Sequence, residues 1–346
     1  MALWLIRAGR HGQGEQRFLD DSRVYLGWGG VDIDLRKVSD RNEVKAVLRE
    51  RMPDAKDGKI NNGASQIWAF AKEMSIGDWF VLPSKMKRAI HVGEIASGLK
   101  YEVINGEPTS YREVKWIETD VPRSNFAQDL LYSFGAFMTV CRIKRNRAEA
   151  RLKEMAAAGW GPTGIPKARP QRQAEAGDEE SASVDIETIA RDQIAELIEA
   201  RFKGHGLAHL VNAVLEAQGY TTFVSPEGPD KGIDILAAPG PLGFGEPRIC
   251  VQVKSGATPL DRPTLDQLIG AMQNVQAQQG LLVSWGGFKS SVDKEKAQQF
   301  FRVRLWDQDA VIDQILEHYD RLDGNLKADL PLKRLWAVAD PEDVAN

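Results

Sequence analysis

Three polar side chains in the C-terminal half have the types and spacing of a hydrolytic site. Asp234 lies within GIDIL, and Gln252 and Lys254 follow within ICVQVKSG. Phosphodiester hydrolysis needs a carboxylate that holds a divalent cation and a lysine beside the attacking water. The cation offsets the charge that develops on the phosphate oxygens and makes hydroxide available near neutral pH. The sequence therefore predicts a metal-dependent site at these three residues.

Two neighbouring strands are expected to position these residues. The first string is apolar on both sides of Asp234 and is followed by Ala-Ala-Pro-Gly, which reads as a turn. In the second string, apolar residues alternate with Gln252 and Lys254, so the two polar side chains share one face. Such an apolar strand requires a counter-charge for Lys254 if the end of this side chain is enclosed.

The elements around these strands are also readable. Apolar spacing predicts a helix over 207–218, and Gly219 ends it. A second helix is expected over 265–275, and GLLVSW at 280–285 has the length of a buried strand. The predicted order is therefore helix, strand, strand, helix, strand.

The C-terminal half resembles the catalytic domain of Mrr-like restriction endonucleases, in the PD-(D/E)xK nuclease superfamily. The resemblance is carried by the string GPDKGIDIL…ICVQVKSG…DQLIGAMQNVQAQQGLLVSWGGFKSSV. The resemblance covers residues 196–318 and is specific at Asp234, Gln252 and Lys254. It implies an α/β restriction-endonuclease-like fold and a homodimer that cuts both strands of DNA. It also implies Mg²⁺ at Asp234 and Gln252, bound loosely and completed by the DNA phosphate because Gln252 is neutral.

One departure from the family concerns the first helix, which often carries a glutamate near its start. Here the nearby residues are Ala208 and His209. Either Glu216 or Asp230 supplies a second carboxylate, or Asp234 acts alone with waters and a carbonyl. Glu216 also fits an ordinary solvated helix position.

Composition favours a cytoplasmic, nucleoid-associated enzyme of two domains. The chain has 346 residues, 42% of them apolar and 27% charged, which is ordinary for globular proteins. Cys141 and Cys250 read as buried thiols, and the five histidines form no zinc motif. The start of the chain lacks the long apolar stretch of a signal peptide or membrane span. A net charge of −4 argues only weakly against nucleic acid binding, because the location of charge matters more than its sum.

A basic run within CRIKRNRAEARLKEM is the local exception to the acidic balance. On a helix, Lys144, Arg147 and Arg151 would share a face and could follow a phosphate backbone. The alternative is a solvated helix face, since Glu149 and Glu154 interrupt the run.

A stretch rich in Gly, Pro, Ala and charge separates the two expected domains. A helix start follows it at Ser183-Val184-Asp185. The expected organisation is a domain at 1–158, a flexible linker at 159–185, a nuclease domain at 186–320 and a C-terminal extension at 321–346.

The N-terminal domain has strand-like strings and two expected helices, at 43–51 and at 62–74, the second with Asn62 or Ser65 near its cap. The strings IGDWFVLPSK, AIHVGEIASGLKYEV and YREVKWIETDV resemble the PUA-like group, which includes the EVE readers of modified nucleotides. The resemblance covers residues 1–145. It implies an α+β domain built on a curved, mostly antiparallel β-barrel with a pocket at one mouth.

Aromatic residues in this domain could form such a pocket. A flipped base is held by stacking between rings and by hydrogen bonds to its edge. Trp28 lies among glycines, and with Trp68 and Tyr101 it is the candidate cage. Ordinary core packing is the alternative for each ring.

Together these features predict a modification-dependent DNA endonuclease of the restriction type, acting in defence against DNA with modified bases. Two alternatives stay open. The chain is a DNA-binding module with an inactive nuclease core, or it is a nuclease effector whose N-terminal domain binds a protein partner or a signalling nucleotide.

Overall fold

The structure, a computed structural model, describes residues 1–9, 11–26, 33–104, 106–136, 138–161, 185–226 and 232–336. The chain divides into two compact units, Met1–Asp192 and Gln193–Asn346, which are described separately. The division falls within helix α6 (Ile186–Arg201), so the start of the helix that the sequence placed in the nuclease domain is grouped with the first unit. Most of the expected linker lies outside the described residues.

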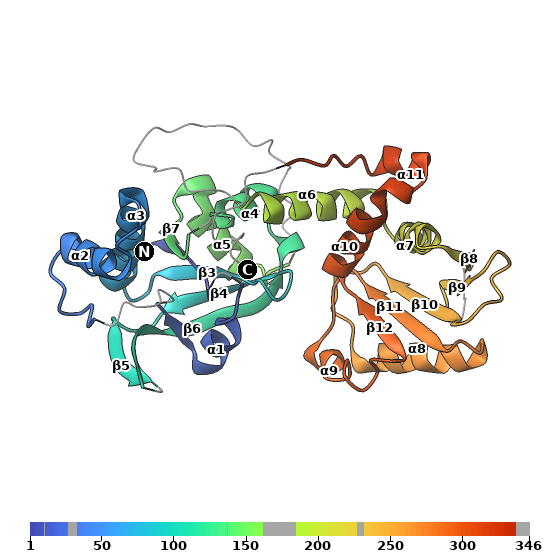
Figure 1. Cartoon of the computed structure of the whole chain (residues 1–346). Helices are drawn as coiled ribbons and strands as arrows, with labels where there is room; N and C mark the ends of the chain where they lie inside the picture. Colours follow the sequence, from blue (N-terminus) through green and yellow to red (C-terminus); the bar gives the residue numbers. More distant parts are fainter. Residues whose placement is uncertain are drawn as a thin grey trace. The chain divides into compact units, whose positions relative to one another are not determined.

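A curled, half-barrel sheet of seven strands forms the centre of the N-terminal unit (Figure 1). Its order is β2-β6-β4-β3-β1-β7, and β5 pairs with β6. All pairs are antiparallel except β1 with β3. The strands are β1 (Leu3–Ile6), β2 (Arg23–Tyr25), β3 (Trp79–Pro83), β4 (Ala89–Ile95), β5 (Lys100–Ile104), β6 (Glu107–Pro122) and β7 (Val140–Arg142). The expected curvature and mostly antiparallel pairing are confirmed, but the sheet is a half-barrel and not the expected barrel, and PUA-like membership stays a prediction.

Successive residues of β1 alternate between two cores, because neighbouring side chains of a strand point to opposite faces. Trp4 and Ile6 pack into one buried cluster, and Leu3 and Leu5 pack into the other. The indole nitrogen of Trp4 donates to the carboxylate of Asp78 over 2.9 Å. This bond ties β1 to the turn before β3.

Short helices surround this sheet. They are α1 (Glu15–Asp21), α2 (Arg41–Arg51), α3 (Asp57–Trp68) with its π-helical continuation η1 (Ala69–Glu73), α4 (Gln128–Phe134) and α5 (Ala148–Ala157), with 3-10 turns η2 (Arg123–Asn125) and η3 (Arg145–Arg147). The helix expected from residue 62 begins five residues earlier, so the expectation of Asn62 or Ser65 at its cap is wrong. Both lie inside α3, where the Ser65 hydroxyl donates to the carbonyl of Asn61.

A buried charge network holds the start of α6 in the N-terminal unit. Asp192 accepts from the guanidinium groups of Arg88 and Arg123, the latter with an Nε–Oδ1 distance of 2.9 Å. The Asp192 side chain is 2% exposed, and those of Arg88 and Arg123 are 14% and 7% exposed. Nearby, Lys85 donates to Asp185 over 2.7 Å. These contacts explain why residues up to 192 group with the first unit.

The C-terminal unit contains a five-stranded sheet in the order β12-β11-β10-β9-β8. β10, β11 and β12 are parallel, and β8 and β9 run antiparallel to their neighbours. The strands are β8 (Tyr220–Val224), β9 (Ile235–Pro239), β10 (Ile249–Lys254), β11 (Gln279–Ser284) and β12 (Val303–Trp306). The helices after α6 are α7 (His205–Ala217), α8 (Arg262–Asn274), α9 (Ser290–Asp293), α10 (Gln308–His318) and α11 (Gly324–Asp329), with the 3-10 turn η4 (Tyr319–Arg321).

Helices cover both faces of this sheet, with α7 and α10 on one side and α8 on the other (Figure 1). Val251 and Val253 face the α7 side, and Cys250 faces α8. Burial raises the pKa of the Cys250 thiol to about 11, and the Asp234 charge adds to the rise. This thiol therefore stays protonated at neutral pH, as expected for a core residue.

The helices and the buried strand expected around the site are confirmed as α7, α8 and β11. One expectation is wrong: Ala-Ala-Pro after Leu236 continues β9 rather than turning. The turn comes at Gly240, whose φ of +90° suits glycine. Of the described helices, none is long and apolar enough to cross a bilayer.

Candidate active site

Asp234 directly precedes β9 and is fastened to β10. Its backbone N–H donates to the carbonyl of Val251 over 3.0 Å, and its Oδ2 accepts from the backbone N–H of Val253 over 2.7 Å. The second bond places the carboxylate beside the peptide that joins Gln252 to Val253. Two strands that are apolar elsewhere thus bring the acid to the predicted amide.

Gln252 is buried, with 2% of its surface exposed. Its Oε1 has no hydrogen-bond donor among the described residues. A Cβ at Gly232 would lie 2.9 Å from Gln252 Nε2, and the φ of Gly232 is +81°, so a larger residue there would be strained and crowded. An unpaired buried amide oxygen costs about 1–3 kcal/mol, which favours a binding role for this oxygen.

Asp234 and Lys254 line one cavity of about 380 Å³ in the C-terminal unit. Other lining residues are His205 and Ala208 from the start of α7, and Ser255 and Thr258 after β10. The structure therefore brings the predicted acid and lysine to the same space. Gln252 lies buried in the strand between Val253 and Val251 and is not a lining residue.

The donor set suits a hard divalent cation. Within the described residues, no three His, Cys, Asp or Glu side chains come together to hold a metal, here or elsewhere, so a cation at this site would depend on other oxygen donors beside Asp234. The Asp234 carboxylate and the orphaned Gln252 Oε1 are oxygen ligands of the kind that Mg²⁺ prefers. Such a cation, when bound, neutralises phosphate charge and acidifies its water.

Gln252→Glu tests whether the buried amide oxygen is a ligand. The change keeps the size of the side chain and adds a charged oxygen, so we expect Mg²⁺ to bind at least as tightly, by up to about tenfold. Calorimetric titration of the full chain with Mg²⁺ measures this affinity. Loss of binding in the glutamate variant would assign Gln252 another role.

The structure does not bring Glu216 to this cavity. Glu216 is exposed near the end of α7, where its Oε1 accepts from Asn212 and from Thr222 over 3.0 and 2.9 Å. Along the helix it lies about 12 Å beyond Ala208, at 1.5 Å per residue. Asp230, the alternative second carboxylate, lies outside the described residues.

His205 lines the cavity but was not a predicted site residue.

The aromatic residues predicted to form a base pocket are partly described. Trp28 lies outside the described residues. Trp68 and Tyr101 are half-buried, and each ring has a cation near it. Lys72 Nζ lies 6.0 Å from the Trp68 ring centre, and Arg36 Cζ lies 5.8 Å from that of Tyr101. Lys72 Nζ also donates to the carbonyl of Arg36 over 3.1 Å. The cation near the Trp68 ring is therefore bonded to the residue whose guanidinium lies near the Tyr101 ring.

The basic run does not form the predicted helix face. Lys144 and Arg147 precede α5, and Arg147 has a φ of +50°, so only Arg151 lies within that helix. Arg151 is paired with Asp129 over 2.6 Å. The shared-face expectation is therefore wrong because the chain turns before the helix begins. Lys144 and Arg147 are exposed, and a role for them in DNA binding stays a prediction.

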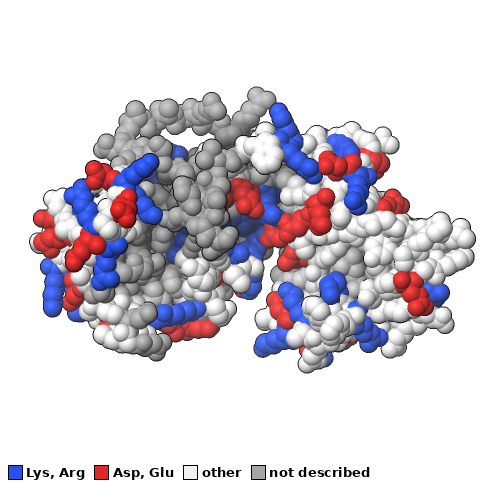
Figure 2. Space-filling model, in the orientation of Figure 1, with Lys and Arg blue, Asp and Glu red and all other residues white. Residues whose placement is uncertain are grey.

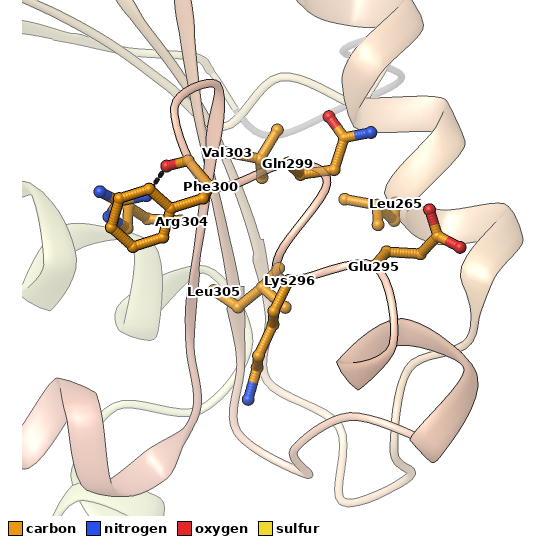
Figure 3. A pocket seen from close by; sticks show the side chains of 8 residues that line it. All are labelled: Leu265, Glu295, Lys296, Gln299, Phe300, Val303, Arg304 and Leu305. Atoms are coloured by element: carbon orange, nitrogen blue, oxygen red, sulfur yellow. Dashed lines mark hydrogen bonds between the residues drawn. The ribbon is translucent and has the colours of Figure 1, made fainter.

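A second, smaller cavity of about 160 Å³ lies beside β12 and contains none of the predicted site residues (Figure 3). Arg304 stacks on Phe300, 4.3 Å from its ring centre, and donates to the Phe300 carbonyl. Glu295 pairs with Arg262 over 2.8 Å. Glu295 is thus engaged with a side chain outside the lining, and Arg304 is engaged with the backbone.

Comparison with known proteins separates the two halves of the chain. Residues 199–315 match the profile of Mrr_cat, a restriction endonuclease domain, and residues 4–140 match a domain of unknown function (DUF8426). No curated protein matches the chain significantly.

Two solved structures are similar. The "DNA modification-dependent restriction endonuclease AspBHI" has a TM-score of 0.34 and 15% identity over 80% of this chain and 74% of its own. The "MspJI Restriction Endonuclease in Complex with 27-mer Oligonucleotide" has a TM-score of 0.32 and 11% identity over 94% of this chain and 71% of its own. Both scores are too low to bear on function. By contrast, the profile match covers the cavity and the two strands that carry Asp234, Gln252 and Lys254, and the segment 199–315 is a restriction endonuclease domain of the Mrr_cat family.

Proposed function

We propose that the chain is a Mg²⁺-dependent endonuclease that hydrolyses DNA phosphodiester bonds and acts on duplexes with modified bases. One observation carries the nuclease part: Asp234 and Lys254 line one cavity. Gln252, two residues before Lys254 in β10, has a buried amide oxygen without a hydrogen-bond donor among the described residues. The endonuclease domain match spans these residues.

Each side chain has a distinct role in this proposal. Asp234 and Gln252 hold the cation with oxygen ligands, and the bond from the Val253 N–H fixes the carboxylate in place. The Lys254 ammonium lies at the attacking water and the phosphate, where positive charge stabilises the developing negative charge. The proposal does not assign Glu216 to the metal site, and the Glu216→Gln variant tests whether it supplies a second carboxylate.

Base reading is proposed for the N-terminal unit. Lys72 lies near the Trp68 ring and Arg36 near the Tyr101 ring, and aromatic rings together with positive charge are the components of a base-stacking surface. On the visible face of this unit, basic and acidic side chains are interspersed (Figure 2). This pattern suits contact with single groups better than broad electrostatic attachment to DNA. A homodimer, a role in defence and a location in the cytoplasm at the nucleoid complete the proposal.

The deciding experiment offers the full chain three duplexes of one sequence: unmodified, with 5-methylcytosine and with hydroxymethylcytosine. Each is incubated with Mg²⁺ or with EDTA. We expect cutting of a modified duplex with Mg²⁺ alone. Equal cutting of all three duplexes would contradict the proposal that the chain recognises modified bases. Cutting only after addition of a cell extract or nucleotide would favour the effector alternative.

Trp68→Ala tests the stacking role. Loss of a stacked ring costs about 1–3 kcal/mol. We therefore expect binding of the preferred modified duplex to weaken about ten- to a hundredfold. Trp28→Ala should behave likewise. Fluorescence anisotropy with the full chain in EDTA measures both affinities without cutting.

Unmodified DNA is the control for these variants, because phosphate contacts dominate its binding. Its affinity should change by less than threefold. Equal losses on modified and unmodified DNA would place the rings in the fold rather than in a reading pocket.

A further inference from the structure

His205, the first residue of α7, faces the same cavity as Asp234 and Lys254. Within the described residues its imidazole has no hydrogen-bond partner, and its ring contact is to His209, edge-on with centres 4.8 Å apart. A structural histidine usually has its ring nitrogens satisfied. This one is only partly buried and lines an open cavity, so its polar atoms are available to a ligand.

Polar groups in the cavity would favour an anion once a cation is bound. Among the described lining residues, the negative charge of Asp234 is balanced by the positive charge of Lys254, and His205 adds an imidazole that can donate a hydrogen bond. A cation bound at Asp234 would make the net charge of this lining positive. The helix that begins at His205 has thirteen residues, and its start carries partial positive charge.

From these observations we propose that His205 is a catalytic residue, whose imidazole donates a hydrogen bond to a non-bridging oxygen of the phosphate that is cut. The inference rests on the nuclease function proposed above and adds a phosphate-contacting side chain to that site. An imidazole N–H supplies a directional donor at a second point of the cavity, whereas Lys254 supplies a mobile ammonium. Two donors from different elements would fix the orientation of the phosphate.

The test compares His205→Ala, His205→Gln and His209→Ala in the full chain, on the duplex that the unaltered protein cuts best. His209 is the matched control, because it is exposed, lies one turn away and touches His205, but does not line the cavity. We expect the single-turnover rate to fall about a hundredfold in His205→Ala, the scale for loss of one donor to a developing oxyanion. His205→Gln should recover at least tenfold, because its amide donates a hydrogen bond, and His209→Ala should stay within threefold.

Two results would overturn the inference while the nuclease proposal stands. One is a His205→Ala rate within threefold of the unaltered protein. The other is an equal loss in His209→Ala, which would mean that the histidine pair supports the helix rather than the phosphate. Failure of the unaltered protein to cut any duplex would overturn the nuclease proposal and this inference together. Melting temperatures within about 2 °C of the unaltered protein would confirm that the variants fold.

Discussion

Asp234→Ala and Lys254→Ala are each expected to reduce DNA cleavage by about 100- to 1000-fold, the scale for loss of one preorganised group that stabilises charge in the transition state. Among the described residues, Asp234 supplies the one carboxylate that lines the cavity, and Lys254 lines it from the end of β10. Single-turnover cleavage of the preferred duplex measures the loss. DNA binding in EDTA should change by less than threefold, because the chemical step is affected and the phosphate contacts elsewhere remain.

Glu216→Gln is the control for the acid. Because Glu216 bonds to Thr222 and Asn212 away from the cavity, its replacement should leave the rate and the Mg²⁺ requirement unchanged if Asp234 acts without a second acid from α7. A strong loss would show that Glu216 completes the metal site after movement of the helix. Full activity in Asp234→Ala would contradict the site itself.

Asp192→Ala is expected to destabilise the N-terminal unit by about 3–5 kcal/mol, because it leaves the buried guanidinium groups of Arg88 and Arg123 without their carboxylate. For a unit of this size the loss lowers the melting temperature by about 10 °C. Scanning calorimetry of the full chain measures the shift. The transition of the C-terminal unit serves as the internal reference.

Glu113→Ala is the matched control for this ion pair. Glu113 pairs with Lys100 over 2.7 Å, but their side chains are 41% and 42% exposed. Exposed pairs contribute little to stability because water screens the charges. If Asp192→Ala costs no more than this control, the buried network does not stabilise the unit.

The sequence predicts the C-terminal site well because its signals are local. Alternation in ICVQVK determines which residues share a face of the strand, the apolar face of 207–218 determines which side of the helix enters the core, and the structure confirms both β10 and α7. The antiparallel pairing of β9 with β10 places Val251 opposite Ile235, and this register brings Gln252 next to Asp234. What the sequence misses is His205, because a histidine at a helix start has no apolar spacing to mark it. Only the packing of α7 shows that it lines the cavity.

The prediction for the basic run is wrong because contacts between residues distant in the sequence determine the local backbone. Helical spacing at 144–151 is overridden by two residues with positive φ, Asn146 and Arg147, before α5 begins. The Asn146 amide donates to the carbonyl of Asp129 over 2.8 Å, a long-range bond that no local pattern reveals. The grouping of residues 186–192 with the first unit could not be read locally either, since the partners of Asp192 lie far away in the sequence.

The position of β1 inside the N-terminal sheet has a consequence for synthesis on the ribosome. β1 lies between β3 and β7, with Leu5 opposite Cys141. At about 5–20 residues per second, the ribosome needs roughly 7–30 s to make the chain between these partners. During that time β1 has an unpaired edge that invites aggregation. The nascent chain should therefore depend on chaperones until β7 emerges, and the unit gains its last buried ion pair only when Asp192 follows.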